Sequence, residues 1–227
     1  MVIGAVINAA SIIAGSGVGL AVKGKVSDKF SEGVMRALGL VICVIGLQGG
    51  LGGDIMLLVV SLAIGTFLGE LAQIDGHLNS FGLWVQEKLK KPGESSTFAQ
   101  GFVTSSLLYC VGAMAIVGSI DSGLRGDQSI IITKSIIDGI ASIFLASTLG
   151  VGVLFSAFVV LVYQGAIELF ASSLQDVFTE GMITQISAVG GIMILGLGAN
   201  MALGAKIKVA NLLPAFIVAV LYYSFVM

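Results

Sequence analysis

Charged side chains are scarce in this chain. They make up 11% of its 227 residues, while hydrophobic residues make up 56%. Ordinary soluble domains contain about 25% charged and roughly 45 to 50% apolar residues. A soluble protein with this composition could not cover its surface with polar groups, so the composition indicates a membrane protein. The net charge is −2 and basic runs are short, which gives no indication of nucleic-acid binding.

Residues that usually carry catalysis or bind metals are also few. The single histidine, His77, lies in a polar connection, and the two cysteines, Cys43 and Cys110, lie far apart in apolar runs. Dispersed thiols of this kind are expected to be small core residues rather than a disulfide or a metal pair. The HExxH, GxSxG and GxxxxGK[ST] motifs do not occur. We therefore expect no enzyme activity, no metal site and no cofactor.

Long apolar runs are abundant. About 20 apolar residues cross the roughly 30 Å hydrocarbon core of a bilayer. Runs of about this length without any charged residue are 1–22, 95–120, 139–167, 181–205 and 209–227. In the first run the lysines follow the apolar residues rather than precede them, which favours a retained span over a cleaved signal peptide.

These runs predict an all-α, polytopic transmembrane helix bundle of seven to eight segments, in which residues 1–227 form a single integral membrane domain. Glycines at Gly150 and Gly152 divide one long apolar stretch into two segments, and Pro214 is expected to break the last segment near its start. Whether 129–148 fully crosses or is re-entrant stays open. The expected spans are 2–22, 34–53, 55–69, 98–119, 129–148, 150–171, 182–203 and 209–226.

Basic residues predict the orientation. With eight alternating spans, all lysines between spans fall on one side of the membrane: Lys23, Lys25, Lys29, Lys88, Lys90, Lys91, Lys206 and Lys208. Lys and Arg favour cytoplasmic loops, so both termini are predicted outside the cytoplasm. The connection 70–96 has apolar residues at helical spacing and is predicted to be an amphipathic cytoplasmic helix at the lipid interface. An ordinary solvated extension is the alternative.

Weak internal similarity suggests an inverted repeat of spans one to three and spans six to eight. Residues 38–47 resemble 189–197 with one residue of slippage, and the triplet 17–19 recurs at 150–152. The two halves would cross in opposite directions, as in many secondary transporters. The chain has 32 glycines, so chance similarity is the competing explanation.

Two charges stand inside an apolar span. Lys134 and Asp138 are four residues apart, which places them on one helix face. Lys134 is about 8 Å into its span and could reach the outer surface, whereas Asp138 lies about 14 Å deep. A structural ion pair and a proton or cation site are both open for this pair. Intramembrane ionisable residues mark functional sites often enough to favour Asp138 as the working group.

Other polar residues at membrane depth would line the same pathway. Each lies in a predicted span and would have to face other polar groups or water rather than lipid. They are Asn8, Gln48, Gln164, Glu168, Asn200 and Asn211.

Three segments resemble domain-of-unknown-function family 554. They are 110–119 (CVGAMAIVGS), 134–139 (KSIIDG) and 211–215 (NLLPA). The resemblance extends over nearly the whole chain. It implies a multi-pass protein of the bacterial cell (plasma) membrane, in a family often described as transporters without a settled substrate. It supplies no site residues.

These observations lead to two hypotheses. The first is a membrane transporter or channel for a small ion or polar solute, with a polar pathway near the midplane around Asp138. The second is a non-transport scaffold or partner-binding protein. It would assemble through glycine-rich helix faces such as Gly15 with Gly19 and Gly65 with Gly69. The partners expected are membrane lipid, a small ion or polar solute and a second copy of the chain in a homo-oligomer; nucleic acid is not expected.

Overall fold

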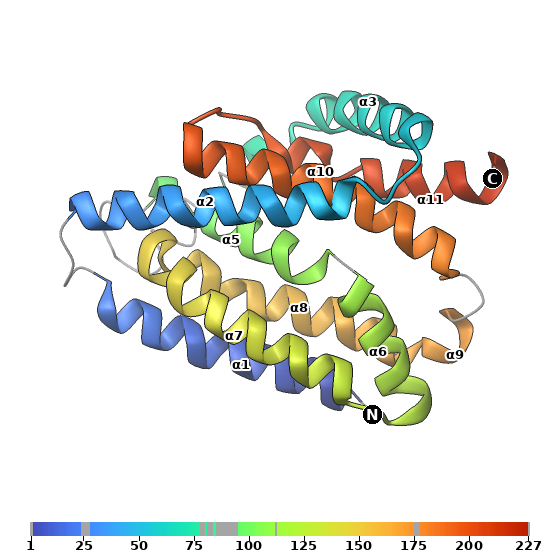
Figure 1. Cartoon of the computed structure of the whole chain (residues 1–227), viewed down its shortest axis with the longest axis horizontal. Coiled ribbons are helices and arrows are strands. Elements are labelled where there is room, and N and C mark those ends of the chain that lie inside the picture. The colour runs from blue at the N-terminus through green and yellow to red at the C-terminus, as the bar shows by residue number, and fades with distance from the viewer. Residues whose placement is uncertain are drawn as a thin grey trace. The chain divides into compact units, whose positions relative to one another are not determined.

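A computed structural model describes residues 2–23, 28–77, 80, 84, 95–111, 113–174 and 178–226. Helices account for nearly all of this part of the chain (Figure 1). In chain order the elements are α1 (Ile3–Val22), α2 (Asp28–Gly50), α3 (Ile55–Leu71), α5 (Ser95–Cys110), α6 (Ala113–Arg125), α7 (Ser129–Leu149), α8 (Gly152–Leu169), α9 (Ala171–Leu174), α10 (Glu180–Leu203), the 3-10 helix η1 (Val209–Leu212) and α11 (Ala215–Val226).

The prediction of an all-α polytopic bundle is confirmed. In the described part of the chain, five helical segments are long and apolar enough to cross a membrane, and the count rises to seven if two bent pairs are each one span. The α2–α3 pair bends by 119° and the α5–α6 pair by 58°. The sequence predicted seven to eight segments, and the higher number counts α2 and α3 as separate spans. At 17 residues, α3 is about 26 Å long, which is at the lower limit for a crossing.

Most of the predicted amphipathic connection cannot be compared with the structure. Residues 78–79, 81–83 and 85–94 lie outside the described residues.

The chain divides into two compact units. Unit 1 comprises Met1–Ser31 and Gly82–Thr179, and unit 2 comprises Glu32–Phe81 and Glu180–Met227. Unit 1 therefore contains α1 and α5 to α9, while unit 2 contains most of α2 together with α3, α10, η1 and α11. Each unit is assembled from parts that are distant in the sequence.

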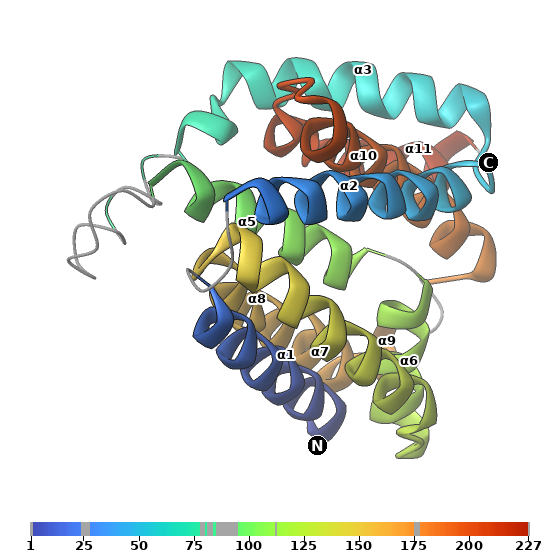
Figure 2. The same cartoon turned by 60° about the vertical axis from the view of Figure 1, so that its left-hand side comes forward.

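In unit 1, α1 packs along α7 in the same direction and along α8 in the opposite direction (Figure 2). The glycines of α1 allow the close approach to α7. A Cβ atom on Gly15 would collide with the carbonyl oxygen of Gly139, and one on Gly19 would collide with that of Ile143. Side chains at these positions would push the helices apart, so α1 and α7 are held at backbone contact.

The α5–α6 pair also belongs to unit 1 and runs in the same direction as α8. Phe98, near the start of α5, makes an edge contact with Phe155 of α8 at 5.5 Å between ring centroids. Gly123, near the end of α6, packs on the carbonyl of Glu168 close to the end of α8. Hence α1 and α7 begin, and α6 and α8 end, at one end of unit 1. We call it the N-terminal end of unit 1.

In unit 2, α2 and α10 cross antiparallel with reciprocal contacts. Gly39 and Gly46 of α2 are seven residues apart, as are Gly191 and Gly198 of α10. A Cβ on Gly198 would lie 2.7 Å from the oxygen of Gly39, and a Cβ on Gly191 would lie 2.7 Å from the oxygen of Gly46. Cys43 of α2 lies between these contacts, and its Sγ is 3.9 Å from the carbonyl oxygen of Leu195. The crossing is therefore locally two-fold symmetric.

The other helices of unit 2 also pack antiparallel. Gly65 of α3 lies against the backbone of Ala215, and Gly69, one turn later, lies against the carbonyl of Asn211. Helix α3 therefore runs antiparallel to η1 and α11. The glycine pairs that could have formed a subunit interface are used inside the chain.

Candidate functional site: a buried polar cluster in unit 1

Lys134 and Asp138 form a buried ion pair on α7. The Lys134 Nζ lies 2.5 Å from Asp138 Oδ2, and the side chains are only 7% and 6% exposed. The expectation that Lys134 could reach the outer surface is wrong. Its ammonium contacts the carboxylate one turn deeper, because opposite charges at this spacing compensate each other within the bundle.

Asn8 joins this pair to α8. Its Nδ2 donates to Asp138 Oδ2 at 3.0 Å and to Gln164 Oε1 at 3.1 Å. Both carboxamide side chains are completely buried. Asn8 sits on the face of α1 that continues into the close contact with α7, and Gln164 lies on the antiparallel α8, so three helices meet at one polar point. The structure thus brings together Asn8, Lys134, Asp138 and Gln164, which the sequence placed in one pathway.

The cluster has unused hydrogen-bonding atoms. Asn8 Oδ1 and Gln164 Nε2 are both buried and have no hydrogen-bond partner among the described residues. One is an acceptor and the other a pair of donors. Buried polar atoms usually have partners in the protein or in ordered water, so these two atoms mark a place where water, an ion or a solute would be stabilised.

Glu168 lies one turn beyond Gln164, at the N-terminal end of unit 1. Its Oε1 accepts a hydrogen bond from the backbone N of Ala5 at 2.7 Å, and its Oε2 is buried without a partner in the described chain. The carboxylate therefore lies at the start of α1, whereas Asp138 lies deeper in the bundle. Glu168 is thus a second buried carboxylate, which lies outside the cluster and nearer to one end of the unit.

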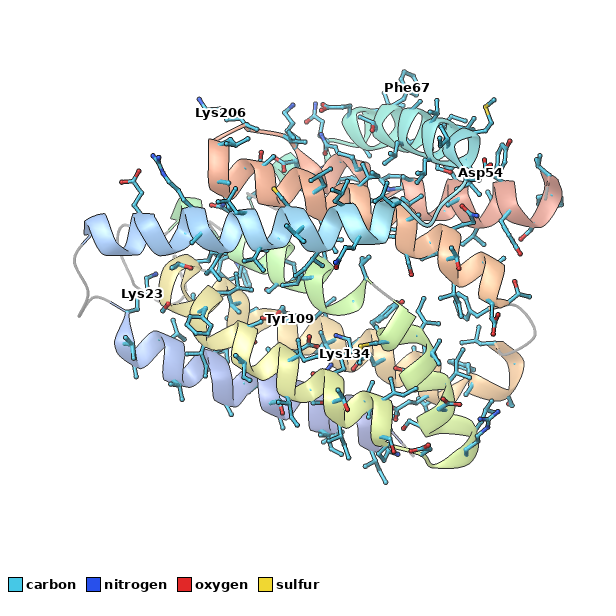
Figure 3. The ribbon with its side chains drawn as sticks, viewed as in Figure 1. Lys23, Asp54, Phe67, Tyr109, Lys134 and Lys206 are labelled. Atoms are coloured by element: carbon cyan, nitrogen blue, oxygen red, sulfur yellow. The ribbon has the colours of Figure 1, made fainter. Side chains whose placement is uncertain are left out.

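A second polar contact lies on the other side of Asp138. Ser142, one turn deeper on α7, is hydrogen-bonded to the hydroxyl of Tyr109 at 2.8 Å. Tyr109 is buried near the end of α5, and Figure 3 shows it together with Lys134 in unit 1. Cys110, the last residue of α5, lies within electrostatic range of both Lys134 and Asp138.

This position coincides with the break between α5 and α6. The sequence predicted one span over 98–119, and in the structure this segment is divided into α5 and α6 with a bend of 58°. The sequence does not single out this position, because glycines also occupy many unbroken helical positions of the described chain. A break next to an ion pair matters chemically, because helix ends leave backbone amides and carbonyls without intrahelical partners.

The predicted breaks have clear structures. Gly150 ends α7 with a φ of 81°, a left-handed conformation that glycine adopts readily, and Gly152 is the first residue of α8. Pro214 lies between η1 and α11. Its carbonyl oxygen accepts from the N of Ile217 at 3.0 Å, so this oxygen belongs to the new helix.

The remaining predicted pathway residues lie in unit 2. Gln48 is exposed on α2. Asn200 makes two hydrogen bonds of 2.7 Å with the backbone of Ile207 and so closes the loop after α10. Asn211 Oδ1 accepts from the N of Asp75 at 2.7 Å. Their role in a pathway stays a prediction.

The loop before α7 supports the start of the helix that carries the ion pair. Asp127 Oδ1 accepts from the hydroxyl of Ser129 at 2.6 Å and from its backbone N at 2.9 Å. These hydrogen bonds, first that of the hydroxyl and then that of the amide, lower the pKa of Asp127 below its usual value. The carboxylate therefore stays charged where the first turn of α7 exposes its amides.

No grouping of three or more His, Cys, Asp or Glu side chains that could hold a metal ion occurs in the part of the chain that the structure covers. The polar cluster offers one carboxylate, two carboxamides and an ammonium. This set can bind a proton at Asp138 or a singly charged ion in exchange for the lysine.

Comparison with known proteins identifies relatives over almost the full length. The model of a family described as "Protein of unknown function (DUF554)" matches residues 3–224. The "Uncharacterized membrane protein YdfK" of Bacillus subtilis (strain 168) is 34% identical over 221 residues, which cover 95% of this chain and 93% of that protein. The "Uncharacterized protein YqgA" of Escherichia coli (strain K12) is 27% identical over 224 residues, which cover 96% and 95%. No solved structure matches.

Proposed function

This chain belongs to the DUF554 family of proteins of unknown function, and we propose that it is a transporter or channel for a small ion or polar solute in a bacterial cell membrane. Asp138 is its proton- or cation-binding group. The observation that carries this proposal is the buried ion pair of Lys134 and Asp138, bonded to the carboxamide of Asn8. It lies among three helices that are long and apolar enough to span a membrane.

The free-energy cost of burying these charges favours a functional ion-binding site over a purely structural ion pair. Two buried charges carry a large desolvation cost, which their attraction only partly offsets, and apolar residues of similar volume often stabilise a bundle equally well. Ionisable groups at membrane depth are costlier still. A cluster with an unused carboxamide oxygen and an unused amide nitrogen is a poor structural solution but a suitable binding place.

The ion pair also suggests how the site changes state. In the structure the ammonium of Lys134 occupies Asp138 Oδ2. A proton on Asp138 would remove the charge that holds Lys134, whereas a bound cation would replace its ammonium. In either case Asn8, which bonds the same carboxylate oxygen, would change its contacts and transmit the event to α1 and α8.

The helix directions support the predicted topology for unit 1. The parallel pair of α1 and α7 and the antiparallel orientation of α8 and of α5–α6 agree with the alternation of spans one, four, five and six. Lys23 follows α1, so the end of unit 1 where α1 finishes is the cytoplasmic end by the bias of basic residues. The N-terminal end of unit 1 then faces outward.

Contacts between helices support the proposed inverted repeat. The pairs α1 with α8, α2 with α10 and α3 with α11 are the three that the repeat relates, and each pair packs antiparallel. The reciprocal glycine contacts between α2 and α10 are those that a two-fold axis in the membrane plane would produce. Secondary transporters commonly use such repeats to open a central site to each side in turn.

The scaffold hypothesis has less support. It relied on glycine faces that would be free for assembly, but Gly15, Gly19, Gly46, Gly65 and Gly69 all lie against helices of their own unit. These five glycines are therefore not available for assembly with another chain.

Flux measurements on purified protein in liposomes test the proposal. A panel of small cations, anions and polar solutes is offered with and without a pH gradient. We expect at least one solute to move, and Asp138→Asn to abolish its flux. Asp121→Asn is the matched control, because Asp121 is a half-buried acid of unit 1 paired with the exposed Arg125, and it should transport normally. Absence of any flux, or equal flux through Asp138→Asn, would overturn the proposal.

A further inference from the structure

Helix α1 has no N-terminal cap of its own. Its N-cap residue is Val2, whose side chain makes no capping hydrogen bond. The first amides of a helix need acceptors, and a carboxylate is the strongest of these because it also complements the helix dipole. Glu168 of α8 supplies this acceptor from across the bundle, at 2.7 Å from the N of Ala5. The charge of one helix thus fixes the start of another.

Only one oxygen of the Glu168 carboxylate, Oε1, accepts this hydrogen bond. Its second oxygen, Oε2, is buried and makes no hydrogen bond with any described residue. The hydroxyl of Ser122 is close enough to act on the Glu168 carboxylate, but it donates to Gln128 Oε1 at 3.0 Å. A buried anionic oxygen without a donor is costly, and a proton on that oxygen removes the cost. The site is therefore suited to bind a proton.

Glu168 is also connected to Asp138 through two contacts. Gln164 lies one turn before Glu168 on α8 and accepts from Asn8, which donates to Asp138. Asn8 belongs to the same helix whose start Glu168 holds. A change at the first turn of α1 therefore reaches the carboxamide that bonds Asp138, within less than one further turn of helix.

We infer that Glu168 is a second proton-binding site, which controls the hydrogen bond between Asn8 and Asp138 through the first turn of α1. As a carboxylate, Glu168 anchors α1 and keeps Asn8 on Asp138. When a proton from the aqueous phase adds to the carboxylate, the neutral acid holds the Ala5 amide less strongly, and α1 loosens at its start. This inference rests on the proposed role of Asp138 as the ion-binding group.

Other charged groups near Glu168 are already engaged. From α7 the charges are Lys134 and Asp138, which pair with each other. From α6 they are Asp121 and Arg125, which pair at 3.5 Å. Asp127, in the loop before α7, bonds Ser129. Helices α1 and α5 contribute no charged side chain. The positive charge of the chain's N-terminal amine also acts on Glu168. Glu168 is thus the buried acid at this end whose charge no side-chain cation balances among the described residues.

Hydrogen exchange followed by mass spectrometry tests this inference without any substrate. The wild-type protein in lipid nanodiscs is measured between pH 4 and 8, and each rate is divided by the intrinsic rate of the same peptide. Loss of a helix cap weakens protection by roughly fivefold. We expect protection of the first turn of α1 to fall by about this factor as the pH decreases. In Glu168→Gln it should be low at every pH, while Glu180→Gln, at the exposed start of α10, should behave as wild type.

The outcomes separate this inference from the proposed function. Protection of α1 that does not change with pH in the wild type, or that is equal in Glu168→Gln, would overturn the role of Glu168 even if Asp138→Asn abolishes flux. The wild-type series requires no substitution, so a variant that fails to fold does not prevent the test. A pH-dependent α1 in a protein without any flux would reject transport and leave proton binding at Glu168 standing.

Discussion

Breaking the buried ion pair on one side only should strongly destabilise the bundle. At 2.5 Å and an effective dielectric constant of about 20, the attraction between the two charges is about 7 kcal/mol before desolvation is subtracted. Removing one partner of such a pair typically costs about 3 to 5 kcal/mol, because the other charge stays buried without compensation. We expect losses of this size for Lys134→Met and for Asp138→Asn.

The double variant Lys134→Met/Asp138→Asn should be more stable than either single variant. It leaves no buried charge, and the new carboxamide can still accept from Asn8. The two losses should therefore fail to add, with a coupling energy of roughly 3 kcal/mol in favour of the double variant. Unfolding in mixed micelles by titration with a denaturing detergent, followed by far-ultraviolet circular dichroism, measures all three values.

An exposed ion pair of the same spacing is the control. Arg36 and Glu32 are also four residues apart and lie 2.6 Å from each other, but their side chains are 65% and 63% exposed. Exposed pairs of this kind contribute about 0.3 to 0.5 kcal/mol, so Arg36→Met should change stability by no more than that. Single-variant losses at Lys134 or Asp138 as small as the control, or strictly additive losses, would show that the pair is solvated and would refute the reasoning.

Two further substitutions test the packing of unit 2. Gly46→Ala should cost more than about 2 kcal/mol, because the added methyl would meet the backbone N of Leu195, while Gly17→Ala, with open space around it, should be neutral or slightly stabilising; the same unfolding assay compares them. Asn200→Ala should cost about 1 to 3 kcal/mol, since it removes both hydrogen bonds to Ile207.

The apolar runs predicted most helix positions because lipid imposes a length on each span. The expected spans 2–22 and 129–148 correspond to Ile3–Val22 and Ser129–Leu149 within one residue. The break after Cys110 could not be located in this way. A glycine permits a break in a helix but does not require one, and the neighbours that decide lie elsewhere in the sequence.

The candidate site was only partly predictable for a related reason. Helical spacing showed that Lys134 and Asp138 share a face, and this holds for Gln164 and Glu168 as well. It could not show that Asn8, 130 residues before Asp138, joins both helices. Lys134 was expected near the outer surface because only its distance from the start of the helix was considered. In the structure its ammonium contacts the opposite charge of Asp138, one turn deeper. Asn200 was expected to face a polar pathway from its position late in a span. In the structure its side chain bonds the backbone of the loop that follows α10.

Charge balance within the cluster limits what the site can carry. With Lys134 and Asp138 both charged, the cluster is neutral. A proton on Asp138 leaves the buried ammonium without its counter-charge, a state as costly as the single variants described above. An anion entering with the proton would restore neutrality, and the unused Gln164 Nε2 is a donor that would help to bind it. A cation that replaces the ammonium meets the opposite difficulty, because Lys134 must then find water or another acceptor. We therefore expect proton-coupled movement of an anion to be the first activity found in the solute panel, and flux of a cation alone, unaffected by Lys134→Met, would contradict this order.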